Sequence, residues 1–139
     1  MTIRTIAELK SDMPLNTPGA ISGQDVVNII DTFDDRASQI IITTNTNLTA
    51  AATDSRRRIV FDSPTAVTLT LPNTLPAGWE AIVVQMGVGP VTIAAAAGGA
   101  RLNRSGHTKI AGRYGVAYLL VVSNAGTAAQ IIMTGDTAA

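Results

Sequence analysis

The hydrophobic pattern of this chain has a helical period up to about residue 37. In "SGQDVVNIIDTFDDR", which begins at Ser22, the apolar residues Val26, Ile29, Ile30 and Phe33 recur at i, i+3, i+4 and i+7. This spacing places them in one stripe on a helix of about three turns. Ser22 and the aspartate three residues later form a capping box at its start. The pattern therefore predicts an amphipathic helix with an apolar face available for packing.

A shorter helix is predicted before this one. Thr5 and Glu8 fit a capping box for "IAELKSDM", and Pro14 would end that helix. The connector "PLNTPGAI" contains Pro18 and Gly19 as helix breakers. Residues 1–37 are thus predicted to form a two-helix module.

From about residue 38 the apolar residues alternate with polar ones, as in β-strands. In "VTLTL", Val67, Leu69 and Leu71 alternate with two threonines. Further short, β-branched segments are "QIIITTNTNLTA", "RRRIVFD", "WEAIVVQM", "PVTIAAAA", "ARLN", "TKIA", "VAYLLVVS" and "AQIIMTG". They predict a mainly β domain over residues 38–139, built as a β-sandwich, a jelly roll or a small barrel. No repeat of solenoid type is evident.

The composition suggests that the chain associates with copies of itself. Hydrophobic residues make up 46% of the sequence and charged residues only 14%, against about 25% charged residues in an average domain. So few charges are easier to reconcile with solubility if part of the surface is covered by other subunits.

The net charge and the termini limit the partners and the location that we expect. A formal net charge of zero argues against a protein whose main task is to bind nucleic acid. No apolar run approaches the roughly 18 residues that span a bilayer. Because "MTIRTIAELKSDMP" lacks the apolar core of a signal peptide, we expect synthesis and folding in a cytoplasm.

The sequence predicts no catalytic, cofactor or metal site. It has no cysteine and a single histidine, His107, so a zinc site would depend on carboxylates. Ser105, His107 and Asp136 could be drawn as a triad, but no local nucleophile motif supports it. Acids are few in the β region, which disfavours a paired-carboxylate glycan hydrolase. We expect His107 to make a surface or interface hydrogen bond.

The only tryptophan and a run of three arginines each have a structural and a functional interpretation. The only tryptophan, Trp79, opens a predicted strand after the loop "LPNTLPAG", and we interpret it as a core residue that covers one end of the domain. Arg56, Arg57 and Arg58 are the densest charge in the chain. They fit an exposed edge or the start of a strand first, an acidic protein partner second and nucleic acid last.

Two segments resemble virion proteins of tailed bacteriophages. "TIAELKSDMPLNTPGAISGQDVVNIIDTF" is similar to a helical module near the start of phage fibre and head-associated proteins. "LTLPNTLPAGWEAIVVQMGVGPVTIAA", "GHTKIAGRYGVAYLLVV" and "AAQIIMTGDTA" are similar to a β-rich phage domain. The resemblance implies a non-enzymatic virion component that forms a homotrimer and binds the major capsid protein or another virion protein.

Length guides the choice among virion roles. A tail fibre generally needs a long repetitive shaft, which the sequence does not suggest, so 139 residues fit a capsid decoration (cement) protein or a short head fibre better. The alternative is a tail fibre or receptor-binding tip that recognises host-surface glycan. A carbohydrate-binding module also stays open, although only five aromatic side chains could stack on sugars: Phe33, Phe61, Trp79, Tyr114 and Tyr118.

Overall fold

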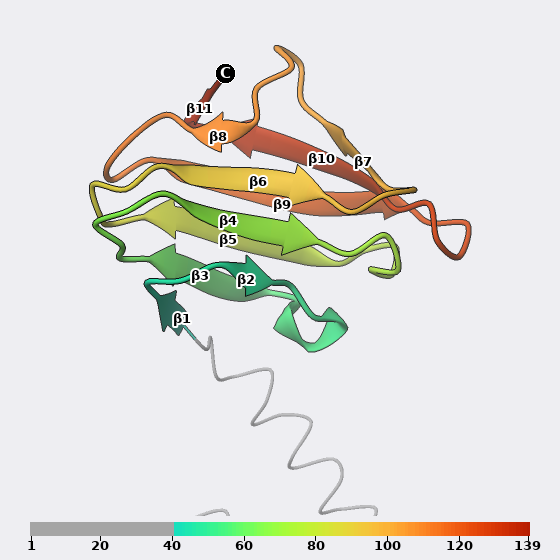
Figure 1. Cartoon of the computed structure of the whole chain (residues 1–139). Helices are drawn as coiled ribbons and strands as arrows, with labels where there is room; N and C mark the ends of the chain where they lie inside the picture. The colour runs from blue at the N-terminus through green and yellow to red at the C-terminus, as the bar shows by residue number, and fades with distance from the viewer. Residues whose placement is uncertain (1–40) are drawn as a thin grey trace, which may run out of the picture. The chain divides into compact units, whose positions relative to one another are not determined.

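A computed structural model describes residues 41–139 of the chain. In this part the fold is mainly β and consists of two mixed sheets (Figure 1), which confirms the predicted β class. The predicted helical module lies outside the described residues, and so does its apolar stripe of Val26, Ile29, Ile30 and Phe33. These predictions therefore stay predictions.

The two sheets contain six and five strands. The six-stranded sheet has the order β1-β3-β5-β9-β10-β7, and the five-stranded sheet has the order β11-β8-β6-β4-β2. The strands are β1 (Ile41–Thr44), β2 (Leu48–Thr49), β3 (Arg57–Phe61), β4 (Val67–Leu71), β5 (Glu80–Gln85), β6 (Val91–Ala95), β7 (Ala100–Leu102), β8 (Lys109–Ile110), β9 (Val116–Ser123), β10 (Gln130–Gly135) and β11 (Thr137–Ala138). A short 3-10 helix, η1 (Ala52–Asp54), precedes β3.

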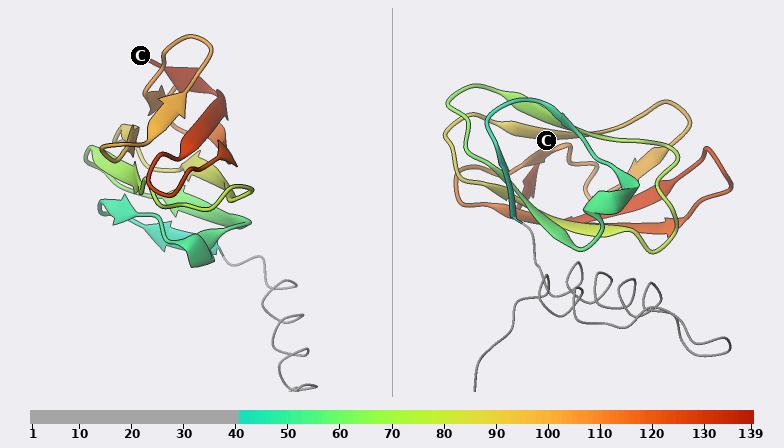
Figure 2. Two further views of the ribbon diagram at one scale, coloured as in Figure 1. Left: turned by 90° about the vertical axis from the view of Figure 1, so that its right-hand side faces the viewer. Right: turned by 90° about the horizontal axis from the view of Figure 1, so that it is seen from below.

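The first six strands wind as a coil between the two sheets (Figure 2). Odd-numbered strands β1, β3 and β5 pair in parallel in one sheet, and even-numbered strands β2, β4 and β6 pair in parallel in the other. Ile59 pairs with Val83 and Leu69 with Ile93, so the partners are separated by the same length of chain in both sheets. The two coils β3–β4 and β5–β6 are therefore stacked at an equal chain length, which the sequence pattern did not reveal. The preceding step is shorter in both sheets, because Ile42 pairs with Ile59 and Leu48 with Leu69.

The corners of successive coils stack directly on each other. Gly87 and Gly89 follow Ser63 and Thr65 by the same number of residues that separates Ile59 from its partner Val83. The Gly89 N–H donates to the Ser63 carbonyl at 2.9 Å. A Cβ on Gly89 would lie 1.9 Å from the Thr65 carbonyl oxygen, and one on Gly87 would lie 2.1 Å from that of Ser63. Only glycine permits this approach of two backbones, so the corner sequence fixes the stacking distance of the coils.

The remaining strands follow a different path. β9 is antiparallel to both β5 and β10, β8 is antiparallel to β6 and β11, and β7 pairs in parallel with β10. An antiparallel sandwich or jelly roll would lack the parallel ladders of the first six strands. The two sheets are therefore mixed, which the sequence could not predict because alternation along one strand does not reveal the direction of its neighbour.

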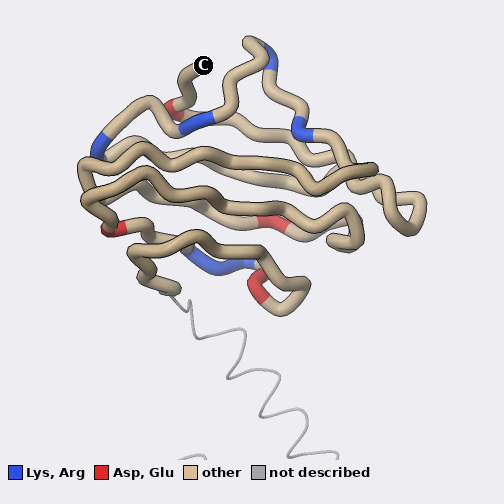
Figure 3. Tube along the Cα trace, in the orientation of Figure 1, with Lys and Arg blue, Asp and Glu red and all other residues tan. Residues whose placement is uncertain are grey.

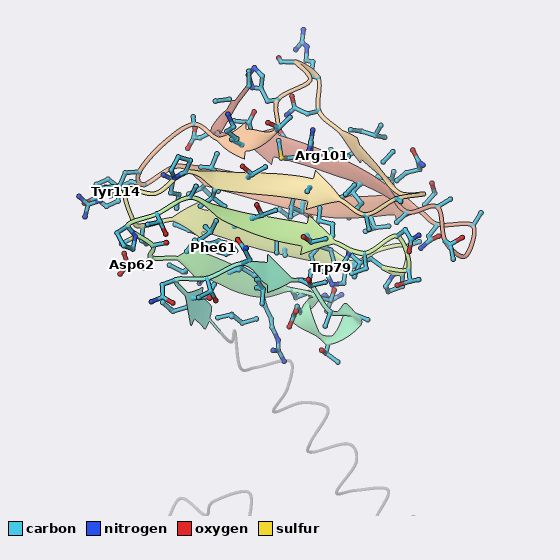
Figure 4. All side chains as sticks on the ribbon, in the orientation of Figure 1. Phe61, Asp62, Trp79, Arg101 and Tyr114 are labelled. Atoms are coloured by element: carbon cyan, nitrogen blue, oxygen red, sulfur yellow. The ribbon has the colours of Figure 1, made fainter. Side chains whose placement is uncertain are left out.

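The core lies between the sheets. In "VTLTL" the three apolar residues are buried and the two threonines half-buried, as the alternation predicted. Trp79 is 1% exposed, and its indole Nε1 donates to the Ala51 carbonyl at 3.0 Å. Figure 4 shows it at the opposite end of the sheets from Asp62 and Tyr114. The interpretation of Trp79 as a core residue at one end of the domain is confirmed.

The segment "QIIITTNTNLTA" is not one strand as predicted. It forms β1 and β2, which belong to different sheets. The turn between them is stabilised locally, because Thr44 Oγ1 accepts the Thr46 N–H at 3.2 Å. Asn47 Oδ1 accepts the Thr68 N–H at 2.8 Å and connects the turn to β4. Short polar side chains can form hydrogen bonds with backbone groups that would otherwise pair in a sheet. Such bonds end β1 at this turn and allow the chain to enter the other sheet.

Candidate functional site

The outer surface of the six-stranded sheet is apolar across five of its strands. We call it the outer apolar face. Its side chains alternate with the buried core positions of the same strands, and four of them are 39–46% exposed. The members of this face are Val60, Ile82, Val84, Leu102, Val116, Tyr118, Leu120, Val122 and Ile132.

Strand register makes this face continuous. Ile82 on β5 lies opposite Tyr118 on β9. Leu120 on β9 lies opposite Ile132 on β10, which in turn lies opposite Leu102 on β7. Directly opposed residues in a ladder have Cβ atoms about 5 Å apart, so these side chains touch in rows across the sheet.

The other sheet has a different outer surface. There the outward positions of β2, β4 and β6 are mainly threonines, with Thr49 opposite Thr70 and Thr68 opposite Thr92. Threonine suits an exposed strand because it combines a β-branched side chain with a hydroxyl that water can solvate. The chain therefore exposes one polar sheet face and one apolar sheet face, and the apolar one is suited to contact with protein.

The outer apolar face contains one polar cluster, formed by the side chains of Tyr118, Glu80 and Arg56. The Tyr118 hydroxyl donates to Glu80 Oε2 at 2.5 Å, and Glu80 Oε1 lies 3.7 Å from Arg56 Nε. The hydrogen bond to Glu80 raises the pKa of Tyr118 above its usual value, and burial and the negative charge of Glu80 add to the effect. The phenol is thus held neutral with its hydroxyl engaged, which leaves the ring as an apolar surface.

The three predicted interface arginines have separate environments. Arg57 Nη1 lies 3.4 Å from Asp54 Oδ1, and both side chains are largely buried. Arg56 pairs with Glu80 but its side chain is 73% exposed, while Arg58 is exposed on β3. β3 lies between β1 and β5, so the stretch starts an inner strand and not an edge. The structure does not bring the three together as one patch.

An exposed aromatic group occupies one corner. Tyr114 is 62% exposed and has a φ of 68°, a left-handed conformation that is rare for a residue with a side chain. The Arg113 guanidinium lies 4.8 Å from the centre of its ring and donates through Nε to the Met86 carbonyl. In the sequence analysis Tyr114 was considered only as one of five aromatic side chains that could stack on a sugar. Its exposure was not predicted.

His107 lies in the loop between β7 and β8. Its Nδ1 is 3.0 Å from Thr137 Oγ1 and its backbone N–H donates to Asn103 Oδ1, so the expected hydrogen bond is present. Asp136 accepts from the Val116 N–H, and the structure shows no triad of Ser105, His107 and Asp136.

Two features are absent from the described part of the chain. In residues 41–139 no group of three His, Asp or Glu side chains could hold a metal ion. Nor is any helix among these residues long and apolar enough to cross a membrane.

In comparisons with known proteins, no family model, curated protein or solved structure matches the chain. The outer apolar face was not predicted from the sequence either. Two segments carried the signal, "AIVV" in β5 and "VAYLLVV" in β9. Continuous apolar runs of this kind are typical of strands that are covered on both faces.

Proposed function

We propose that this chain is a non-enzymatic structural protein of a phage virion, a capsid decoration (cement) protein or short head fibre that assembles as a homotrimer. The outer apolar face carries this proposal. Nine apolar side chains cover one face of the β domain. Burial of this face against another copy of the chain would explain how a protein with so few charged residues stays soluble.

The charges around this face support contact between copies. Arg58 and Glu80 are the charged residues on the strands β3 and β5 that point outward there. Glu80 already bonds to Tyr118 and pairs with Arg56, so its charge is partly compensated before another subunit covers the face. Arg58 would lie at the margin of such a contact or pair with an acid of the other copy. Aromatic and aliphatic side chains with few charges are typical of interface centres.

In this proposal residues 1–37 are the attachment module. Their predicted apolar stripe would bind the major capsid protein or another virion protein, and the β domain would form the exposed trimer. The resemblance to phage fibre and head proteins supports this division of roles, as does the change of hydrophobic period near residue 38. The protein would then be located in the virion after synthesis in the host cytoplasm.

A tail fibre or receptor-binding tip that recognises host glycan is the second candidate. In the sequence analysis a tail fibre was the less favoured role, because the sequence does not suggest a long repetitive shaft. The parallel steps from β3 to β5 and from β4 to β6 have equal length, and stacked coils of this kind can extend lengthwise. The exposed Tyr114 beside Arg113 adds a surface on which a sugar could stack.

Electron microscopy of labelled virions tests both candidates. A labelled copy of the chain should appear at regular positions on the head if it is a decoration protein, and at the tail tip if it is a receptor-binding protein. Absence of label from purified particles, with the chain present in the infected cell, would contradict both.

A further inference from the structure

The loop between β7 and β8 borders a pocket with a basic rim. Two adjoining pockets of about 460 and 370 Å³ lie beside it. Both are lined by Leu102, Asn103, Arg104, His107 and Ile132. We call them together the β7–β8 pocket.

Asn103 fixes the shape of this loop. Its Oδ1 accepts the backbone N–H groups of Ser105 at 2.9 Å and His107 at 3.0 Å. Its Nδ2 donates to the Met133 carbonyl at 2.9 Å and lies 3.3 Å from Thr137 Oγ1. One side chain thus joins the loop to β10 and β11, so the pocket is preformed.

The charge around the pocket is positive. No aspartate or glutamate occurs from residue 81 to residue 135, whereas this stretch contains two basic residues that line the pocket, Arg101 and Arg104, and Lys109 on β8. Figure 3 shows the basic positions along β7, the following loop and β8. The next acid, Asp136, already accepts the Val116 N–H at 3.2 Å.

Arg104 is the exposed cation of this pocket that no described side chain neutralises, because it forms no ion pair with any described residue. Arg101 points between the sheets, where Nη1 donates to the Ile93 carbonyl, and its Nε is buried without a partner among residues 41–139. His107 uses Nδ1 for Thr137. Arginine guanidinium groups pair well with the planar or tetrahedral oxygens of carboxylate, sulfate and phosphate.

We propose that the β7–β8 pocket binds a small ligand through an oxyanion group, a carboxylate, sulfate or phosphate. Arg104 pairs with the anion, the His107 ring donates to it, and the exposed side chains of Leu102 and Ile132 contact the apolar part of the ligand. This binding does not depend on the virion role proposed above. Because Leu102 and Ile132 also belong to the outer apolar face, the ligand and a neighbouring subunit would compete for this margin of the face.

Amide chemical shifts of the full chain test the site. We expect residues 103–107 to shift saturably with methyl glucuronide and not with methyl glucoside, its neutral counterpart. Equal affinity for inorganic phosphate would support a general oxyanion site, and tighter binding of the glucuronide would support an acidic saccharide. If neither anion gives saturable shifts, or if the glucoside binds as tightly, the proposal is wrong.

A pair of arginine variants separates this site from general charge attraction. Arg104→Gln should weaken binding about tenfold, or about 1.4 kcal/mol, while Arg113→Gln removes the same charge from the corner beside Tyr114 and should leave binding unchanged. Both arginines lie at surface positions, so we expect both variants to fold. Equal weakening by the two variants would overturn the proposal.

Discussion

Trp79 stabilises the domain through both its ring and its indole N–H. Trp79→Ala should lower the free energy of unfolding by about 3–5 kcal/mol, because a buried aromatic ring is lost and a cavity remains. The Ala51 carbonyl also loses its donor. Denaturant unfolding measures the change. A stable Trp79→Ala protein that had lost ligand binding would instead show that residue 79 belongs to a binding site.

Tyr118 makes stability depend on alkaline pH. Its raised pKa, caused first by the hydrogen bond to Glu80, means that the unfolded chain loses this proton at lower pH than the folded one. The stabilisation is therefore complete below pH of about 10, the usual tyrosine pKa, and decreases as pH rises above it.

The Tyr118→Phe variant isolates this effect. The difference in unfolding free energy between wild type and Tyr118→Phe should be constant below about pH 10 and should fall above it. Denaturant unfolding of both proteins over that range measures the difference. A difference that stays flat would show that Glu80 does not hold the phenol proton.

At the residue scale, sequence reasoning succeeded where one side chain has a strong intrinsic preference. Trp79 was placed in the core because a large ring at the start of a strand is seldom left exposed. The arginines at 56–58 were grouped because they are adjacent in sequence, yet Arg57 binds Asp54 and Arg56 binds Glu80. Their separation depends on the fold around each side chain, and a charge count cannot reveal it.

At the element scale, the stacked corners set the geometry of the coil. Gly89→Ala should destabilise the domain by about 1–3 kcal/mol, as overpacking does, because its Cβ would meet the Thr65 carbonyl at 1.9 Å. The neighbouring Val88 is 65% exposed, so Val88→Ala should change stability by less than about 0.5 kcal/mol. Thermal unfolding of the two variants should separate them clearly, and equal stability would refute the close stacking.

The predicted amphipathic helix of residues 22–36 has its own test. Replacing Ile29 and Ile30 with aspartate would put two charges on its apolar stripe, which should cost several kcal/mol if the stripe is buried against a partner. Particle decoration by the double variant should therefore be lost. Wild-type occupancy on purified particles would contradict the attachment role of residues 1–37.

The strands themselves were largely predictable, but their pairing was not. Alternation in "VTLTL" and β-branched runs between turn residues located most of them. The division of "QIIITTNTNLTA" into β1 and β2 depends on a turn bonded through Thr44 and on Asn47 reaching β4. Parallel pairing joins strands that are not consecutive in the chain, such as β3 and β5, and a local pattern contains no information about such a partner.

At the scale of the whole molecule, the two sheet surfaces differ in chemistry. Threonines cover one, and the outer apolar face covers the other. A free monomer would expose the apolar face to water, which is unfavourable by about 25 cal/mol for each Å² of apolar surface. In the proposed trimer, a ring of three copies would bury this face.

Sedimentation velocity of the purified chain measures whether this trimer forms. Wild type should sediment as a trimer, and Ile82→Glu, which puts a charge at the centre of the outer apolar face, should sediment as a folded monomer. Thr92→Glu puts the same charge on the other sheet, opposite Lys109, and should leave the trimer intact. A monomeric wild type, or a trimer that persists in Ile82→Glu, would contradict the account.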